Sequence, residues 1–204
     1  FEEVPRGIDE THHVAADHDA QVLVRWGDAV LKDAPAFDVN RQTPSAQLAQ
    51  FGYNNDFIGF VPLPEGSQAS DRGLLCVHHE YTNDDLMHAG LPDGAAPAQI
   101  AAFFTREVVE ISMAAHGGSI VEVARDADGK WRVVQDSEYN RRLTPLSTAM
   151  SFSGPAAGHE RLQTNEDPTG LMVMGTFNNC AGGITPWGTW LMSEENFNFY
   201  FIVV

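Results

Sequence analysis

The sequence has few basic residues, only two cysteines and no long apolar run. Its 12 Lys and Arg residues, of which only Lys32 and Lys130 are lysines, face 28 Asp and Glu residues, so the formal net charge is −16. Nucleic acids and anionic membranes are bound through clusters of Lys and Arg. No stretch approaches the ~18 consecutive apolar residues of a membrane-spanning helix. The composition therefore argues against nucleic-acid binding and against membrane insertion.

The two cysteines, Cys76 and Cys180, are too few for a disulfide-stapled scaffold, although a single bridge between them stays open. A chain of 204 residues buries roughly 70% of its unfolded surface, so it needs neither disulfides nor metals merely to fold. A bound metal would therefore serve function. The surplus carboxylates have two interpretations, a solvated surface and oxygen ligation of hard cations such as Ca²⁺.

Short strand patterns dominate the chain and predict a mainly β fold. Each is a run rich in Val, Leu, Ile or aromatic residues and bounded by turn residues. Asp128 and Gly129 supply the tight turn of the clearest hairpin. Strands are predicted at 21–26, 57–61, 73–79, 119–124, 130–135, 170–176, 188–193 and 197–204. Short strands at such spacing suit a propeller or a sandwich.

One inserted amphipathic helix is predicted between Pro97 and His116. Pro97 suits its first turn, and Gly117 with Gly118 suits its end. Apolar side chains at spacings of three and four are expected to face the core, namely Ile100, Phe103, Phe104, Val108, Ile111 and Ala115.

The two ends of the sequence predict a piece of a longer protein. Phe1 is not an initiator methionine, and no basic and apolar signal segment follows it, as expected for a trimmed end. Residues 197–204 form an apolar strand pattern with no partner after it. We therefore expect residues 1–204 to be the N-terminal portion of one larger domain.

Residues with metal-binding or catalytic chemistry gather first between Cys76 and Asp85, where a strand runs into a loop rich in His, Asp and Asn. Side chains alternate along a strand, so His78 and Glu80 share a face and are able to point toward one ion, with Cys76 below them. The alternative is that His78 or His79 is hydrogen-bonded in the core and that the acidic run forms an ordinary turn.

A second gathering lies at 175–190, where a strand is expected to open into an Asn-Asn-Cys-Ala-Gly-Gly turn. Glycines there permit backbone conformations that expose N–H groups and Cys180 to one cavity. The Cys180 thiol has three candidate roles: nucleophile, metal ligand and small buried residue. Ligation is favoured over nucleophilic attack, because no base is adjacent in sequence and the next segment offers further ligands.

The third gathering is the pair Glu194 and Glu195, at the end of the strand predicted at 188–193. Adjacent carboxylates on extended chain point to opposite faces, so one of them reaches a metal while the other bonds a neighbour. The alternative is a solvated pair of glutamates.

Taken together, six segments make the chain similar to the PhoX-type bacterial alkaline phosphatases. Three of them are RWGD at 25–28, FGYNNDFIGF at 51–60 and HHEYTN at 78–83. The other three follow in matching order, SFSGPAAGH at 151–159, DPTG at 167–170 and GTFNNCAGGITPWGTWLMSEENFNFYF at 175–201. The resemblance covers most of the chain.

This resemblance implies a β-propeller phosphomonoesterase that is periplasmic or secreted, hydrolyses small phosphate esters and holds Fe³⁺ and several Ca²⁺ ions. It implies that Cys180 ligates iron and that Glu80, Glu194 and Glu195 are candidates for the other ligands, with the choice within the pair left open. Asn178 is predicted to contact substrate, and no catalytic residue is assigned. Because family members are much longer, further acidic ligands and a phosphate-binding arginine are expected beyond residue 204.

Two other functions stay open at this point. A calcium-stabilised, non-catalytic propeller would bind a partner through Trp187, Trp190, Tyr200 and Phe201, although core packing is the favoured role of these aromatics. A propeller hydrolase of another ester, such as a lactone, would use Ca²⁺ as a Lewis acid. A phosphate dianion is repelled by a chain of net charge −16 unless cations lie in the cleft, so a phosphatase of this composition requires metals.

Overall fold

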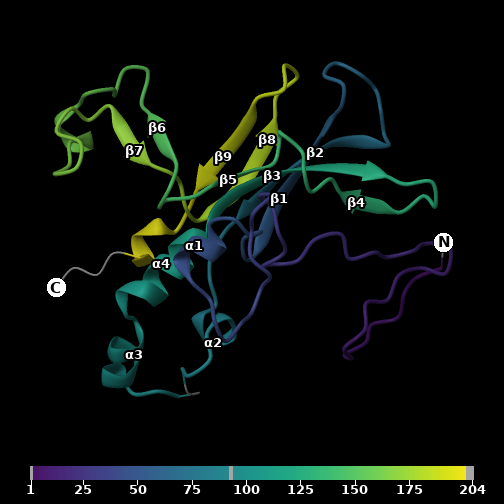
Figure 1. The fold of residues 1–204 in the computed structure, drawn as a ribbon, viewed down its shortest axis with the longest axis horizontal. Helices are drawn as coiled ribbons and strands as arrows, with labels where there is room; N and C mark the ends of the chain where they lie inside the picture. Colours follow the sequence, from purple (N-terminus) through teal and green to yellow (C-terminus); the bar gives the residue numbers. More distant parts are fainter. Residues whose placement is uncertain (1, 92–93, 201–204) are drawn as a thin grey trace.

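The main element of the computed structural model, which describes residues 2–91 and 94–200, is a five-stranded antiparallel sheet (Figure 1). Its strands are β1 (Asn55–Pro62), β2 (Arg72–His79), β3 (Gly117–Arg125), β4 (Trp131–Val133) and β5 (Arg141–Leu143). The order is β1-β2-β3-β4, and β5 also pairs with β3. The long strand β3 is therefore central, with β2 along one edge and both β4 and β5 along the other.

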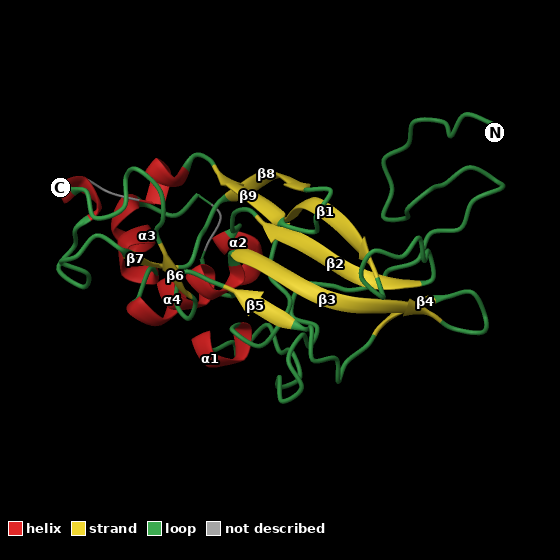
Figure 2. Cartoon of the chain, turned by 90° about the horizontal axis from the view of Figure 1, so that it is seen from above, coloured by secondary structure: helices red, strands yellow, loops and turns green. Residues whose placement is uncertain are grey.

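Two small antiparallel hairpins complete the β structure. One joins β6 (Ala149–Ser151) to β7 (Met172–Met174), and it lies apart from the sheet in Figure 1. The other joins β8 (Asn179–Ile184) to β9 (Trp190–Glu194) and packs against β1 and β2, as Figure 2 shows. The fold is mainly β with few helices, and the described residues form no closed barrel.

Four short helices gather toward one end of the sheet (Figure 2). They are α1 (Pro44–Gln47), α2 (Asp84–Met87), α3 (Pro97–Phe103) and α4 (Arg106–Ala115), and 3₁₀ turns follow at Glu160–Leu162 and Phe197–Tyr200. Within the described ranges, none of the helices has the length and hydrophobicity needed to cross a bilayer.

The two faces of the sheet are covered by different parts of the chain. Val77, Val121 and Val123 lie on one face and pack with Val30 and Phe51 into the buried core. Side chains alternate along β2, so His78 lies on the other face of the sheet. In the register of the sheet, it pairs with Gly118 of β3. The hairpin β8–β9 covers that second face.

Several sequence-based expectations about elements are confirmed, and others are wrong. The strands expected at 57–61, 73–79 and 119–124 correspond to β1, β2 and β3. Those expected at 130–135, 170–176 and 188–193 appear as the shorter or shifted β4, β7 and β9.

The strand expected at 21–26 does not form. The Gln21 side chain donates to the Trp131 carbonyl (2.7 Å) and accepts from the Trp131 N–H (3.2 Å). These two bonds take the place of a backbone ladder along β4, so residues 21–26 lie beside that strand without joining the sheet.

The single helix expected between Pro97 and His116 is two helices. Phe104 leaves the helical conformation with ψ 71°, and the Thr105 hydroxyl then accepts from the Val108 N–H and caps α4. The expected core role holds for Ile111, which is buried, but not for Ile100, which is 39% exposed.

Two further corrections concern the segment that follows β7. The Asn-Asn-Cys-Ala-Gly-Gly segment is strand from Asn179 onward rather than a turn, because it pairs with β9. The strand expected at 197–204 begins instead with the 3₁₀ turn Phe197–Tyr200, and residues 201–204 lie outside the described residues.

Candidate metal centre

Asp56, Glu80 and Cys180 come together where β1, the end of β2 and β8 meet. Each offers one ligand atom, and these atoms all lie within 4.8 Å of one another. The Cys180 thiol donates to Asp56 Oδ2 over 3.1 Å. The Glu80 N–H donates to the Asn54 carbonyl over 2.9 Å, which extends the β1–β2 pairing and places Glu80 beside Asp56. The sheet and the second hairpin thus bring together groups that are far apart in the sequence.

The electrostatics of this group favour a bound cation. Burial raises the pKa of Glu80, and the charges of Asp56 and Glu195 raise it further. The hydrogen bond to Asp56 is the main cause that raises the pKa of Cys180 to about 12, followed by burial and the charges of Asp56, Glu195 and Glu80. In residues 2–91 and 94–200, no Lys or Arg forms an ion pair with these carboxylates. A multivalent cation would relieve the repulsion and favour the deprotonated thiol.

The donor atoms fit the metals that the resemblance implies. Carboxylate oxygens are the ligands that Ca²⁺ prefers, and a thiolate selects a transition metal. Glu80 and Cys180 were predicted as ligands, and they lie in one group. Asp56 was missed, although it lies in the segment 51–60, because a single aspartate near the start of a strand carries no signal of its own.

Glu194 and Glu195 point to different partners. Glu194 Oε1 accepts from the Thr176 hydroxyl (2.8 Å) and from the Phe177 N–H (3.1 Å). The charge of Glu195 instead acts on Glu80 and Cys180. The expectation that adjacent carboxylates diverge therefore agrees with the geometry, and Glu195 is the member of the pair on the side of the Asp56, Glu80 and Cys180 group.

Asn178 is a buried turn residue. The residue is 3% exposed and has a φ of 53°. Its backbone carbonyl accepts a hydrogen bond from the Glu195 N–H over 3.0 Å. Asn54 and Asn196 also have positive φ and flank Asp56 and Glu195. Asparagines with left-handed backbone conformation therefore lie next to the segments that carry Asp56, Cys180 and Glu195. The predicted substrate contact of Asn178 stays a prediction.

Replacing Asn178 tests whether this backbone conformation matters. Asn178→Ala is expected to lower the free energy of unfolding by about 1–2 kcal/mol, because alanine keeps the Cβ that crowds the following carbonyl oxygen but lacks the short polar side chain that lets asparagine tolerate the left-handed conformation. Asn178→Gly is expected to keep most of the stability, because glycine adopts positive φ freely. Urea unfolding of both variants measures the difference. Equal losses would contradict a role for the backbone conformation.

The other candidate ligands near Glu80 have structural partners. The His78 ring donates from Nδ1 to the Cys180 carbonyl over 2.8 Å, and His79 Nε2 lies 2.7 Å from Ser119 Oγ. Both histidines are fully buried, which confirms the alternative of hydrogen-bonded core residues. Cys76 is a buried free thiol, and burial raises its pKa to about 11. Cys180 is also free, so the two cysteines form no disulfide.

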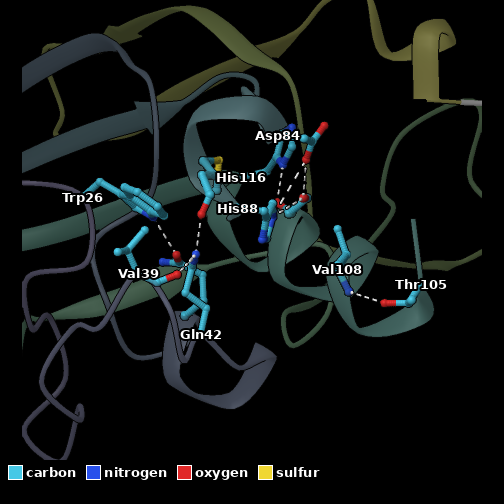
Figure 3. Close-up of polar contacts among 11 residues, drawn as sticks. Trp26, Val39, Gln42, Asp84, His88, Thr105, Val108 and His116 are labelled. Carbon is cyan, nitrogen blue, oxygen red and sulfur yellow. Dashed lines mark hydrogen bonds and ion pairs between the residues drawn. The ribbon is translucent and has the colours of Figure 1, made fainter. Parts of the chain in front are cut away.

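A second polar cluster joins α2 to α4 (Figure 3). Ser112 Oγ donates to Asp84 Oδ1 (2.9 Å) and lies 3.5 Å from His88 Nε2. His116 donates from Nδ1 to the Ser112 carbonyl (2.6 Å), so its Nε2 accepts from the Tyr200 hydroxyl (2.8 Å). Asp84 Oδ1 lies 3.9 Å from the same His88 nitrogen that faces the serine, so the carboxylate does not orient the ring from Nδ1 and this cluster is not a nucleophilic triad. It attaches Tyr200, in the segment after Glu195, to α4.

One protein family and one solved structure are similar to this chain. The family model described as "Alkaline phosphatase PhoX" matches residues 1–204. A solved structure, "Pseudomonas fluorescens PhoX in complex with vanadate, a transition state analogue", is 41% identical with a TM-score of 0.74. The similarity covers 87% of this chain and 28% of that one, so the chain spans less than a third of that PhoX. Comparison with curated proteins finds no match. The chain belongs to the PhoX alkaline phosphatase family.

Proposed function

We propose that the full-length protein is a metal-dependent phosphomonoesterase that releases inorganic phosphate from small phosphate esters. The observation that carries the proposal is the convergence of Asp56, Glu80 and Cys180, in a chain of this family, with no Lys or Arg ion-paired to them among the described residues. The vanadate complex of the Pseudomonas fluorescens relative supports the reaction class, because vanadate is described there as a transition state analogue.

In this proposal Cys180 binds Fe³⁺, and Asp56, Glu80 and Glu195 bind iron or Ca²⁺ through oxygen. When bound, these cations supply the positive charge that attracts a phosphate dianion to an acidic chain and stabilises the transition state. Glu194 holds the turn at Thr176 and Phe177 and so keeps Glu195 directed toward the cluster. The protein's own residues therefore fix the positions of the cations.

We further propose that the enzyme extends beyond residues 1–204, because the similarity covers only 28% of the Pseudomonas fluorescens PhoX chain. We take residues 1–204 as the N-terminal portion of one propeller domain in a periplasmic or secreted enzyme, with the phosphate-binding arginine beyond them. Arg142 does not serve that purpose, because its buried guanidinium donates to the carbonyls of Ala114, His116 and Gly118.

One observation favours the second candidate, a calcium-stabilised binding module without catalysis. Trp187 is 75% exposed, although it was expected to pack in the core. Trp190 is partly buried against His78, and Tyr200 is 41% exposed. The exposed aromatics give this module a surface for a partner. Phe201 lies outside the described residues.

The test is hydrolysis of p-nitrophenyl phosphate by the full-length protein before and after treatment with a calcium chelator. We expect release of p-nitrophenol that is lost with the metals and restored by calcium. The same chelation should lower the melting temperature, because a ligand that binds only the native state stabilises it by mass action. A metal-dependent melting temperature without hydrolysis would support the binding module. Hydrolysis that resists complete metal removal would contradict the proposed function.

A further inference from the structure

His78 bridges the sheet and the hairpin that carries Cys180. Its Nδ1 lies 2.8 Å from the Cys180 carbonyl oxygen. A carbonyl only accepts hydrogen bonds, so the His78 ring donates here. The proton of this hydrogen bond is therefore on Nδ1.

The space around this ring is shaped for it. The ring stacks on Trp190 at a centroid distance of 5.2 Å and an interplanar angle of 28°, and Phe57 packs against it at 5.2 Å. A Cβ at Gly182 would lie 2.5 Å from His78 Cε1, and a Cβ at Gly118 would lie 2.5 Å from the Trp190 ring. The ring therefore has little freedom to turn away from Cys180.

The Cys180 side chain points from this fixed backbone toward Asp56, to which its thiol donates over 3.1 Å. Cys180 is therefore held at two points. Its carbonyl accepts from His78, and its sulfur lies beside the carboxylates of Asp56 and Glu80. Cys180 lies in the irregular part of the β8–β9 ladder, since the register shifts between Asn179 and Gly182. The backbone there lacks the regular ladder that would otherwise hold the cysteine.

We propose that His78 is a positioning residue, whose Nδ1–H bond to the Cys180 carbonyl sets the direction of the cysteine sulfur in the metal centre. This inference rests on the proposed function, because it requires that Cys180 is a metal ligand. In this role the histidine acts on the Cys180 backbone and not as a ligand. The His78 hydrogen bond takes the place of the backbone hydrogen bond that a regular β8–β9 ladder would give Cys180. A thiolate ligand needs such support, because it must approach its metal at a defined distance and angle.

The test compares two amide substitutions of His78 in the full-length protein loaded with ferric iron and calcium. His78→Asn places an amide N–H near the position of Nδ1, whereas His78→Gln places it near Nε2, away from the Cys180 carbonyl. The two variants carry the same amide group and differ by one methylene, which changes the position of the donor. His79→Gln is the packing control, because His79 is equally buried but bonds Ser119 on the other face. Visible thiolate-to-iron absorption, iron per chain and melting temperature are measured.

We expect His78→Gln to shift or weaken the thiolate-to-iron absorption and to lower iron affinity by about 10- to 100-fold, the usual effect of losing an outer-shell partner. His78→Asn should keep a band close to that of the parent, and His79→Gln should leave the band unchanged even if it melts earlier. Equal spectra and iron affinities for the two His78 variants would overturn the proposal. If a variant fails to fold, His78→Phe, which fills the space without a donor, replaces it.

Failure of the proposed function gives a different result. In that case the parent shows no thiolate band that depends on Cys180, and the positioning role falls with it. If the parent shows such a band and His78→Gln leaves it unaltered, only the positioning role is wrong.

Discussion

Cys180→Ser is expected to remove iron, visible absorption and phosphatase activity together from the full-length protein. A serine hydroxyl is a hard and poorly ionised donor, so it does not replace a thiolate on a transition metal. Activity should fall by at least about 100-fold, more than the loss of an outer-shell group usually causes. Iron analysis, the visible spectrum and hydrolysis of p-nitrophenyl phosphate measure the three quantities on one preparation.

Cys76→Ser is the matched control for this experiment. Cys76 is the other free cysteine, 3% exposed within β2, so its replacement should lower stability somewhat and leave the metals in place. Full iron occupancy and activity in Cys180→Ser would show that Cys180 is not a ligand.

Glu80→Gln is expected to weaken calcium binding by at least about tenfold and to lower activity, because it removes one hard ligand from a site with few others. In the metal-free protein the same change should raise stability at neutral pH, since it removes repulsion among Asp56, Glu80 and Glu195. Calorimetric titration with calcium and thermal unfolding without metal measure the two effects. A variant with unchanged calcium affinity would place Glu80 outside the site.

The pH dependence of the metal-free protein follows from the raised pKa of Glu80. A carboxyl whose pKa is higher in the folded state binds more protons there than in the unfolded chain. Its contribution to stability is therefore fully present below the unfolded pKa and is lost as pH rises through the folded pKa. Glu80→Gln should flatten this part of the stability profile, and added calcium should raise stability on the alkaline side.

The strands that carry the site were predictable because their signal is local. The apolar runs that became β2 and β3 are bounded by turn residues, and alternation placed His78 and Glu80 on one face. Both residues lie beside Cys180: His78 donates to its carbonyl, and Glu80 lies in the group with its thiol. Cys180 was predicted as a ligand because it lies in the segment 175–201, which resembles the family.

The remainder depended on long-range contacts that local patterns do not encode. Asp56 joins the site only because β1 pairs with β2 and β8 packs against β1. The helix breaks at Phe104 and Thr105 because the Thr105 side chain caps the start of α4. The apolar stripe alone predicted an uninterrupted helix. The strand pattern at 21–26 was misleading, because the Gln21 side chain took the place of backbone pairing.

The most direct test of the metal centre is elemental analysis of the purified full-length protein alongside its Asp56→Asn, Glu80→Gln and Cys180→Ser variants. We expect stoichiometric iron and calcium in the parent, with iron lost from the Cys180 variant and calcium reduced in at least one carboxylate variant. An active parent that contains neither metal, or metal contents that all three substitutions leave unchanged, would contradict the proposed metal centre.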